Sequence, residues 1–186
     1  NLHTLQKFTR DVLTKKGKTI KLENYKLETE IDKLGKIDKV LTRGQLALVQ
    51  VVKEPISTKG PRLSCDISIA GRFLVLVPFA NGVNISKKIT SKAERNRLQK
   101  LMTSIKPKNY GVIVRTVAEG KAVEEMERDL KESIAKWEEG IKKLIDAKPT
   151  ERIIGEMSRA TSMLRDLLNN DFDNVIGSAS RACDPP

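Results

Sequence analysis

Short apolar runs, bounded by glycine, proline and charged residues, recur through the first 118 residues of the chain. They are rich in valine, isoleucine and leucine, which favours β-strands over helices. We expect strands over residues 27–34, 45–52, 63–69, 72–78 and 110–117. A short helix is predicted ahead of them by apolar residues at helical spacing, which are Leu2, Leu5, Phe8, Val12 and Leu13. This part of the chain is therefore expected to be mostly β.

One amphipathic helix is predicted between the last two of these strands. It begins at the capping-box pattern Ser91-Lys-Ala-Glu94, in which the serine side chain can accept a hydrogen bond from the glutamate N–H. Pro107 ends it. The apolar residues between these points fall on one helical face and are Leu98, Leu101, Met102 and Ile105.

A longer amphipathic helix is predicted from Lys121 onward, because apolar residues there step by three and four. They are Val123, Met126, Leu130, Ile134, Trp137, Ile141, Leu144 and Ile145. Trp137 lies on this stripe and is expected to be a core residue rather than an exposed stacking platform, and Gly140 is expected to weaken the helix. A shorter helix follows Pro149, with Met157, Ala160, Leu164, Leu167 and Leu168 on one face, and residues 172–176 can form one more strand. The predicted fold class is α+β.

Length and charge narrow the kind of protein. The 186 residues are enough to bury a core in one domain or two small ones, and no apolar run approaches the roughly 18 residues of a membrane span. A cytoplasmic location is the default expectation. The net charge of +11 divides into +6 for residues 1–60, +9 for residues 61–118 and −4 for residues 119–186. The basic middle third can attract a polyanion. Charge alone, however, supports polyanion binding and a simple role in solubility equally.

No catalytic or metal-binding constellation is predicted. The only histidine is His3, so a serine or cysteine nucleophile has no well-placed base. Cys65 and Cys183 lie far apart and predict neither a disulfide framework nor a zinc site, and Cys65 is expected in a buried strand. The acidic residues of the long helix lie among lysines and are expected to form a solvated face; they are Glu124, Glu125, Glu127 and Asp129.

Three basic elements favour binding of an anion. Lys59-Gly-Pro-Arg62 places two cations around a turn, although an ordinary soluble hairpin would look the same. Arg115-Thr116 ends an apolar run, so the arginine either lies at the exposed end of a strand or faces a buried anion. Arginine offers a planar fork for phosphate oxygens, and threonine adds a hydroxyl. Gly71 can let a ligand approach its N–H, and Lys87-Lys88 add positive charge before the capped helix.

Two stretches carry a resemblance to a known family. Residues 51–78, which read VVKEPISTKGPRLSCDISIAGRFLVLVP, and residues 111–120, GVIVRTVAEG, resemble the ribonuclease E/G family. The similarity runs from about residue 1 to about residue 176. It implies part of an S1 (OB-type) RNA-binding barrel over residues 1–62, a small α/β 5'-sensor domain over 63–118 and part of an RNase H-like domain over 119–176. Residues 177–186 are expected to be a disordered tail.

The resemblance also implies roles for six residues. Arg115 and Thr116 would hold the 5'-monophosphate of a single-stranded RNA, with the backbone of Gly71 and the side chain of Val75 completing the pocket. Lys59 would contact RNA at the edge of the S1 barrel. Lys87 occupies a position where the family typically has arginine, so it keeps the charge without the fork.

The same resemblance implies what this chain lacks. The family's nuclease centre holds Mg²⁺ with carboxylates that lie beyond residue 176, and the cysteine-based zinc link between subunits is missing. We therefore expect a monomer that binds no cofactor, and that binds single-stranded RNA without cutting it, as part of an endoribonuclease of RNA processing, decay and rRNA maturation. Two alternatives stay open: a non-catalytic RNA-binding adaptor, and a scaffold whose long helix docks a protein and whose RNA affinity is indifferent to Arg115→Ala.

Overall fold

The structure is a computed structural model that describes residues 8–15, 18–26, 36, 38, 41–155, 159–167, 174 and 176. The chain divides into two compact units, Asn1–Gly155 and Glu156–Pro186. The helices are α2 (Arg10–Leu13), α3 (Lys92–Ile105), α4 (Val123–Lys143) and α5 (Arg159–Leu167), with 3₁₀ turns η1 (Leu22–Asn24) and η3 (Thr116–Ala118). The strands are β1 (Thr14–Lys15), β2 (Lys18–Thr19), β3 (Gln50–Lys53), β4 (Arg62–Ser64), β5 (Ile69–Ala70), β6 (Leu74–Pro78), β7 (Val83–Ile85) and β8 (Tyr110–Val114).

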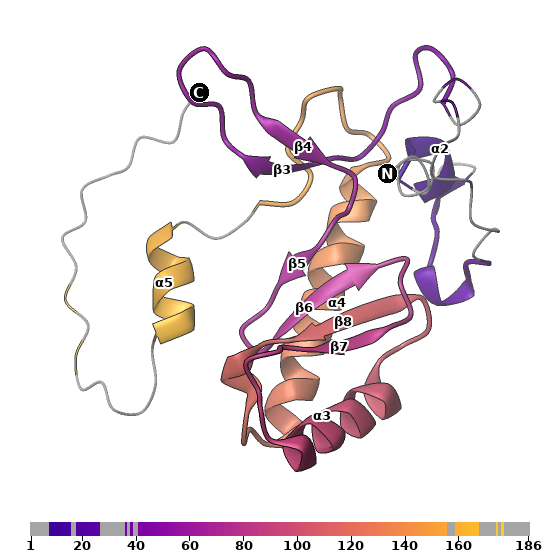
Figure 1. The fold of residues 1–186 in the computed structure, drawn as a ribbon. Coiled ribbons are helices and arrows are strands. Elements are labelled where there is room, and N and C mark those ends of the chain that lie inside the picture. The colour runs from indigo at the N-terminus through magenta and orange to yellow at the C-terminus, as the bar shows by residue number, and fades with distance from the viewer. Residues whose placement is uncertain are drawn as a thin grey trace. The chain divides into compact units, whose positions relative to one another are not determined.

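A four-stranded sheet in the first unit has the order β5-β6-β8-β7 (Figure 1). β6 runs antiparallel to both β5 and β8, whereas β7 is parallel to β8 and is joined to it through α3. Such a parallel pair needs a crossover connection, which the amphipathic helix supplies. Two smaller antiparallel sheets, β1-β2 and β3-β4, account for the remaining strands of the described residues.

The core lies on one face of this sheet. Burial alternates along β6, where Leu74 and Leu76 are buried and Val75 between them is half-buried, as expected when only one face is covered. The helix α4 crosses the covered face and contacts β6 and β5 (Figure 1). Trp137 of α4 is 2% exposed and meets the ring of Phe8 edge to face, which confirms its predicted place in the core.

Both predicted amphipathic helices of this unit are confirmed. α3 begins after Ser91, whose hydroxyl accepts a hydrogen bond from the N–H of Glu94 at 3.4 Å, and it extends to Ile105. α4 continues through Gly140 to Lys143, and the expected weakening of the helix at this glycine stays a prediction. A Cβ at Gly140 would lie 2.3 Å from a side-chain carbon of Ile154. Glycine here therefore allows the segment after the helix to pack closely against it.

Several strands differ from the sequence prediction because pairing, not propensity, decides where a strand lies. The expected strand 63–69 is split between two sheets: β4 pairs with β3, and β5 pairs with β6. Cys65 consequently lies between strands and is only half-buried. The expected strand 45–52 is reduced to β3, and β7 was not predicted at all. The predicted strands 27–34 and 172–176 and the tail 177–186 lie outside the described residues or almost entirely so.

The mixed α+β class, with open sheets and one long helix, is confirmed, and the small two-stranded sheets are consistent with an incomplete barrel. The domain boundaries at 62/63 and 118/119 stay predictions. In the structure α4 shares one hydrophobic core with the four-stranded sheet.

α5 forms near the predicted third helix, with the side chains of Met163 and Leu167 exposed. Among the described residues, no helix combines the length and apolar character needed to cross a bilayer.

A carboxylate ties the start of α3 to the turn before α4, and this makes part of the stability depend on pH. Glu94 accepts two hydrogen bonds from Arg97 at 2.7 Å each and one from the N–H of Gly120 at 2.9 Å. The Arg97 hydrogen bonds, followed by that of Gly120, lower the pKa of Glu94 from its ordinary value of 4.5 to about 2.

Because the folded-state pKa lies below the unfolded one, the contribution of Glu94 to stability is complete above about pH 4.5 and is lost as the pH falls towards 2. We expect Glu94→Gln to lower the free energy of unfolding at pH 7. The difference from the wild type should shrink progressively as the pH falls. Urea unfolding at pH 7, 4 and 3 measures it, with Glu124→Gln on the exposed side of α4 as the charge-matched control. A deficit that is the same at all three pH values would contradict the assignment.

Candidate nucleic-acid interface

A buried carboxylate organises the loop that connects β5 to β6. Asp129 of α4 is 7% exposed and accepts three backbone hydrogen bonds from this loop. The N–H of Arg72 donates to Oδ1 at 2.8 Å, and the N–H groups of Phe73 and Leu74 donate to Oδ2 at 2.8 and 2.9 Å. One side chain thus holds two residues of the loop and the first residue of β6 in place.

The same carboxylate explains why residue 71 is glycine. A Cβ at Gly71 would lie 2.6 Å from both carboxylate oxygens of Asp129, a distance that real Cβ atoms do not tolerate. From the sequence we expected a ligand to approach the N–H of Gly71. In the structure this N–H donates to the carbonyl of Leu74 at 2.8 Å. The structural reason for this glycine is close packing against Asp129, and its assignment to a ligand site stays a prediction.

Arg115 meets this loop from the end of β8. Its Nη1 donates to the carbonyls of Gly71 and Arg72, each at 3.0 Å, and its own N–H donates to the carbonyl of Phe73 at 2.8 Å. The predicted strand 110–117 ends at Val114, and Arg115 precedes the 3₁₀ turn η3. The sequence left two positions open for Arg115: the exposed end of a strand, or contact with a buried anion. In the structure Arg115 lies at the end of the strand and is half-buried.

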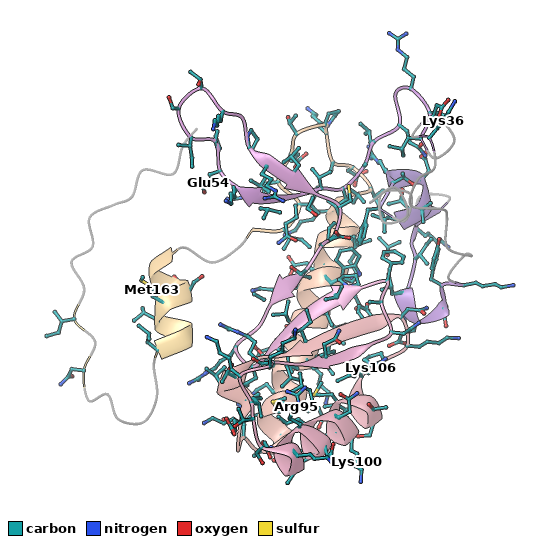
Figure 2. The ribbon with its side chains drawn as sticks, in the orientation of Figure 1. Lys36, Glu54, Arg95, Lys100, Lys106 and Met163 are labelled. Atoms are coloured by element: carbon teal, nitrogen blue, oxygen red, sulfur yellow. The ribbon has the colours of Figure 1, made fainter. Side chains whose placement is uncertain are left out.

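Thr116 links this arginine to a basic turn. Its hydroxyl lies 3.0 Å from the hydroxyl of Ser86, which also accepts a hydrogen bond from the N–H of Lys88. Arg95, on α3 (Figure 2), donates from Nη1 to the carbonyls of Ser86 and Ile89 at 2.8 and 3.2 Å. The turn that carries Lys87 and Lys88 is therefore held beside Thr116, and both lysines are exposed.

Val75 lies on the uncovered face of the sheet. It pairs with Ala70 of β5 and Ile113 of β8, and Ile113 is 40% exposed. Because directly paired residues of neighbouring strands share a face, Ile113 projects to the same side as Val75. The structure thus brings together Gly71, Val75, Arg115 and Thr116, with the turn of Lys87 next to them.

Two further cations surround this cluster and were not singled out in the sequence. The guanidinium carbon of Arg72 and the Nζ of Lys121 lie 5.3 and 5.9 Å from the centroid of the Phe73 ring. Phe73 itself is buried. Positive charge therefore gathers at the end of the sheet where β8 finishes.

Lys59 belongs to a different part of the unit. It lies in the loop of the β3-β4 hairpin, where the N–H of Lys59 donates to the carbonyl of Ile56 at 3.0 Å, and its side chain is exposed. The hairpin exposes apolar side chains as well, including Val51, Val52 and Leu63. Since this hairpin is a separate two-stranded sheet, Lys59 does not share the sheet that carries the other five predicted residues.

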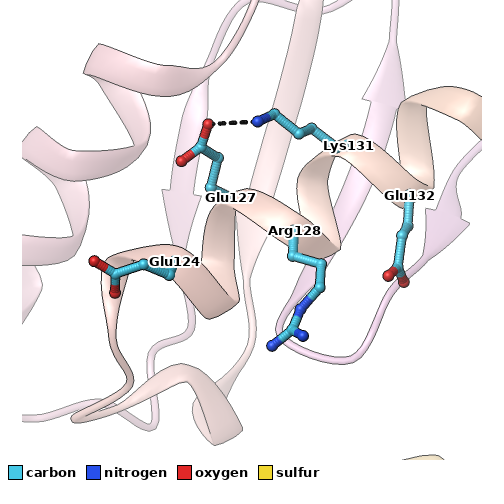
Figure 3. A pocket seen from close by; sticks show the side chains of 5 residues that line it. All are labelled: Glu124, Glu127, Arg128, Lys131 and Glu132. Atoms are coloured by element: carbon cyan, nitrogen blue, oxygen red, sulfur yellow. Dashed lines mark ion pairs between the residues drawn. The ribbon is translucent and has the colours of Figure 1, made fainter.

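The acidic residues of α4 divide into two groups. Glu124 is exposed, and Glu127 pairs with Lys131 at 2.7 Å (Figure 3); Glu125 accepts a hydrogen bond from the N–H of Ala122. This agrees with the predicted solvated face, and among the described residues no cluster of His, Cys, Asp or Glu could hold a metal ion. Asp129 was wrongly placed on that face. Its position three residues after Met126 and next to Leu130, on the apolar stripe, was the signal for burial.

The fold and this cluster define an α+β domain with basic side chains gathered at one end of its main sheet. The chain belongs to the ribonuclease E/G family, whose model matches residues 68–184. It is 38% identical over 144 residues to ribonuclease E of Nostoc sp., covering 77% of this chain and 21% of that protein. It is 44% identical over 104 residues to ribonuclease E of Synechocystis sp., covering 56% and 15%.

Ribonuclease G of Escherichia coli is 34% identical over 139 residues, covering 75% of this chain and 28% of that protein. The chain therefore spans less than a third of the length of each of these relatives. The resemblance stated from the two sequence stretches is confirmed at the level of the family.

Proposed function

We propose that this chain is the RNA-binding and 5'-monophosphate-sensing part of a single-strand-specific endoribonuclease that acts in RNA processing. The observation that supports it is the contact between Arg115 and the loop of Gly71, residues 44 positions apart in the sequence. The family resemblance implies both residues for the same site, and Arg115 Nη1 donates to the carbonyl of Gly71 at 3.0 Å.

The proposed chemistry is multipoint recognition of a terminal phosphate. Arg115 supplies a planar guanidinium whose position is set by two carbonyls, and such a fork matches the oxygens of a phosphate. Thr116 supplies a hydroxyl, and Lys87 and Lys88 raise the positive potential nearby. Val75 offers an apolar contact to the terminal nucleotide on the uncovered face of the sheet. Lys59 holds the RNA strand elsewhere, as a charge on an exposed hairpin loop.

We propose that this chain binds RNA and does not cleave it. Cleavage in the parent protein would use Mg²⁺, which activates water and stabilises charge on the scissile phosphate; we place its carboxylate ligands in another part of that protein. We expect the chain alone to be a monomer that leaves bound RNA intact.

The test compares one short single-stranded RNA with a 5'-monophosphate and with a 5'-hydroxyl, at two salt concentrations. A terminal phosphate with charge-assisted hydrogen bonds should increase affinity by about tenfold or more. Because the rest of the RNA is the same, nonspecific binding should weaken equally for both as salt rises. Equal affinity for the two RNAs at both salt concentrations would contradict the proposal and leave only a basic surface.

A further inference from the structure

We propose that Asp129 is a positioning residue for the phosphate site: it fixes the β5-β6 loop so that the loop can hold the Arg115 guanidinium in its binding orientation. This inference rests on the proposed function, and it concerns a residue that neither the sequence pattern nor the family match assigned to the site. Asp129 acts through other residues, because its carboxylate is directed at the loop backbone.

Three backbone N–H groups of the loop point in one direction. The N–H groups of Arg72, Phe73 and Leu74 all converge on the Asp129 carboxylate. In an extended backbone the N–H and C=O groups of successive peptides alternate in direction, so three convergent N–H groups require a tight turn. An anion in this concavity keeps the turn in one conformation, as carboxylates do at helix N-termini.

The turned loop directs two carbonyl oxygens the opposite way, toward Arg115. The peptide that joins Gly71 to Arg72 contributes its N–H to Asp129 and its C=O to Arg115 Nη1. The next peptide does the same with the N–H of Phe73 and the C=O of Arg72. Since peptide units are planar, the orientation imposed by Asp129 at one end of each unit sets the carbonyl orientation at the other.

The three hydrogen bonds to Asp129 are not needed to connect β5 to β6. The loop joins two antiparallel strands that already pair at Ile69 with Leu76 and Ala70 with Val75. Asp129 is 55 to 57 residues away in sequence from the groups that it binds. It therefore couples the position of α4 to the orientation of Arg115.

The test uses the whole chain with Asp129→Asn, which keeps the shape but replaces one acceptor oxygen with an amide NH₂ directed at a backbone N–H. The control is Glu132→Gln, the same chemical change three residues further along α4 on its exposed side (Figure 3). Each protein is measured with 5'-monophosphate and 5'-hydroxyl RNA, after circular dichroism has verified folding. Asp129→Ser, which retains a single acceptor, is the second variant.

We expect wild type and Glu132→Gln to share the same preference for the monophosphate. Asp129→Asn should reduce that preference by about tenfold, the scale of one misplaced charge-assisted contact, while affinity for 5'-hydroxyl RNA stays unchanged. A general loss of stability would instead lower both affinities or neither, so the ratio separates a positioning role from a merely structural one.

Retention of the wild-type preference in both Asp129 variants would overturn the inference and leave the proposed function intact. Unfolding of both variants would also overturn it, because Asp129 would then be needed for the fold and not specifically for the site. If wild type itself shows no preference for the monophosphate, the proposed function fails and the inference fails with it.

Discussion

Replacing Arg115 with alanine is expected to remove the preference for 5'-monophosphate RNA and to lower affinity for that RNA by about 10- to 100-fold. The size follows from hydrogen bonds between charged groups, each of which contributes about 1.5–3 kcal/mol. Affinity for 5'-hydroxyl RNA should change little, because the other cations of the unit stay in place. Equilibrium binding by fluorescence anisotropy, at one fixed salt concentration, measures both affinities.

Two further variants make this experiment specific. Arg115→Lys keeps the charge without the planar fork, so we expect it to regain less than half of the lost preference in free energy. Arg128→Ala removes one positive charge from the outer side of α4 (Figure 3) and should preserve the preference. If Arg115→Ala binds both RNAs as wild type does, Arg115 does not hold the phosphate, and a scaffold role for the long helix becomes the better account.

Substituting Gly71 with alanine is expected to destabilise the fold by about 2–3 kcal/mol and to weaken phosphate recognition at the same time. The new Cβ would need the space of the Asp129 carboxylate, 2.6 Å away, and overpacking of this kind costs about 1–3 kcal/mol. Displacing the carboxylate would also weaken its three hydrogen bonds to the loop. Urea unfolding at pH 7 measures the stability change.

A double-mutant cycle identifies the cause. In the background of Asp129→Ala the carboxylate is gone, so adding Gly71→Ala should cost less than it does in the wild type. Gly120→Ala is a poor control because Gly120 has a positive φ of 70°. Gly60→Ala is the better one, since nothing lies within 4 Å of its added Cβ. Additive costs for Gly71→Ala and Asp129→Ala would contradict the packing explanation.

The local pattern of the sequence was sufficient for the helices and for the family. The spacing of Leu98 and Met102, and of Met126, Leu130 and Trp137, identified the buried faces of α3 and α4, because helical periodicity is set by the backbone and is independent of the partner. The two stretches around Gly71 and Arg115 indicated the ribonuclease E/G family, which the family model confirms.

Strand positions were less predictable, because a strand exists only through its neighbour. The run from Leu63 to Ile69 looked continuous, yet its two ends pair with different partners, β3 and β6. Val83–Ile85 is short and forms a strand through its parallel pairing with β8, a contact that α3 makes possible by connecting the two. Local propensity contains no information on such pairing.

The sequence by itself determined the helical faces and the basic middle third. It also singled out five residues that lie around one end of the main sheet, which are Gly71, Val75, Lys87, Arg115 and Thr116. Only the tertiary structure decided that Asp129 is buried beneath the loop of Gly71, and that Arg115 is held by the carbonyls of that loop. The physical reason is distance along the chain. Hydrogen bonds between groups 44 to 57 residues apart form when α4 packs on the sheet, and no pattern within a short window specifies which buried polar groups will then meet.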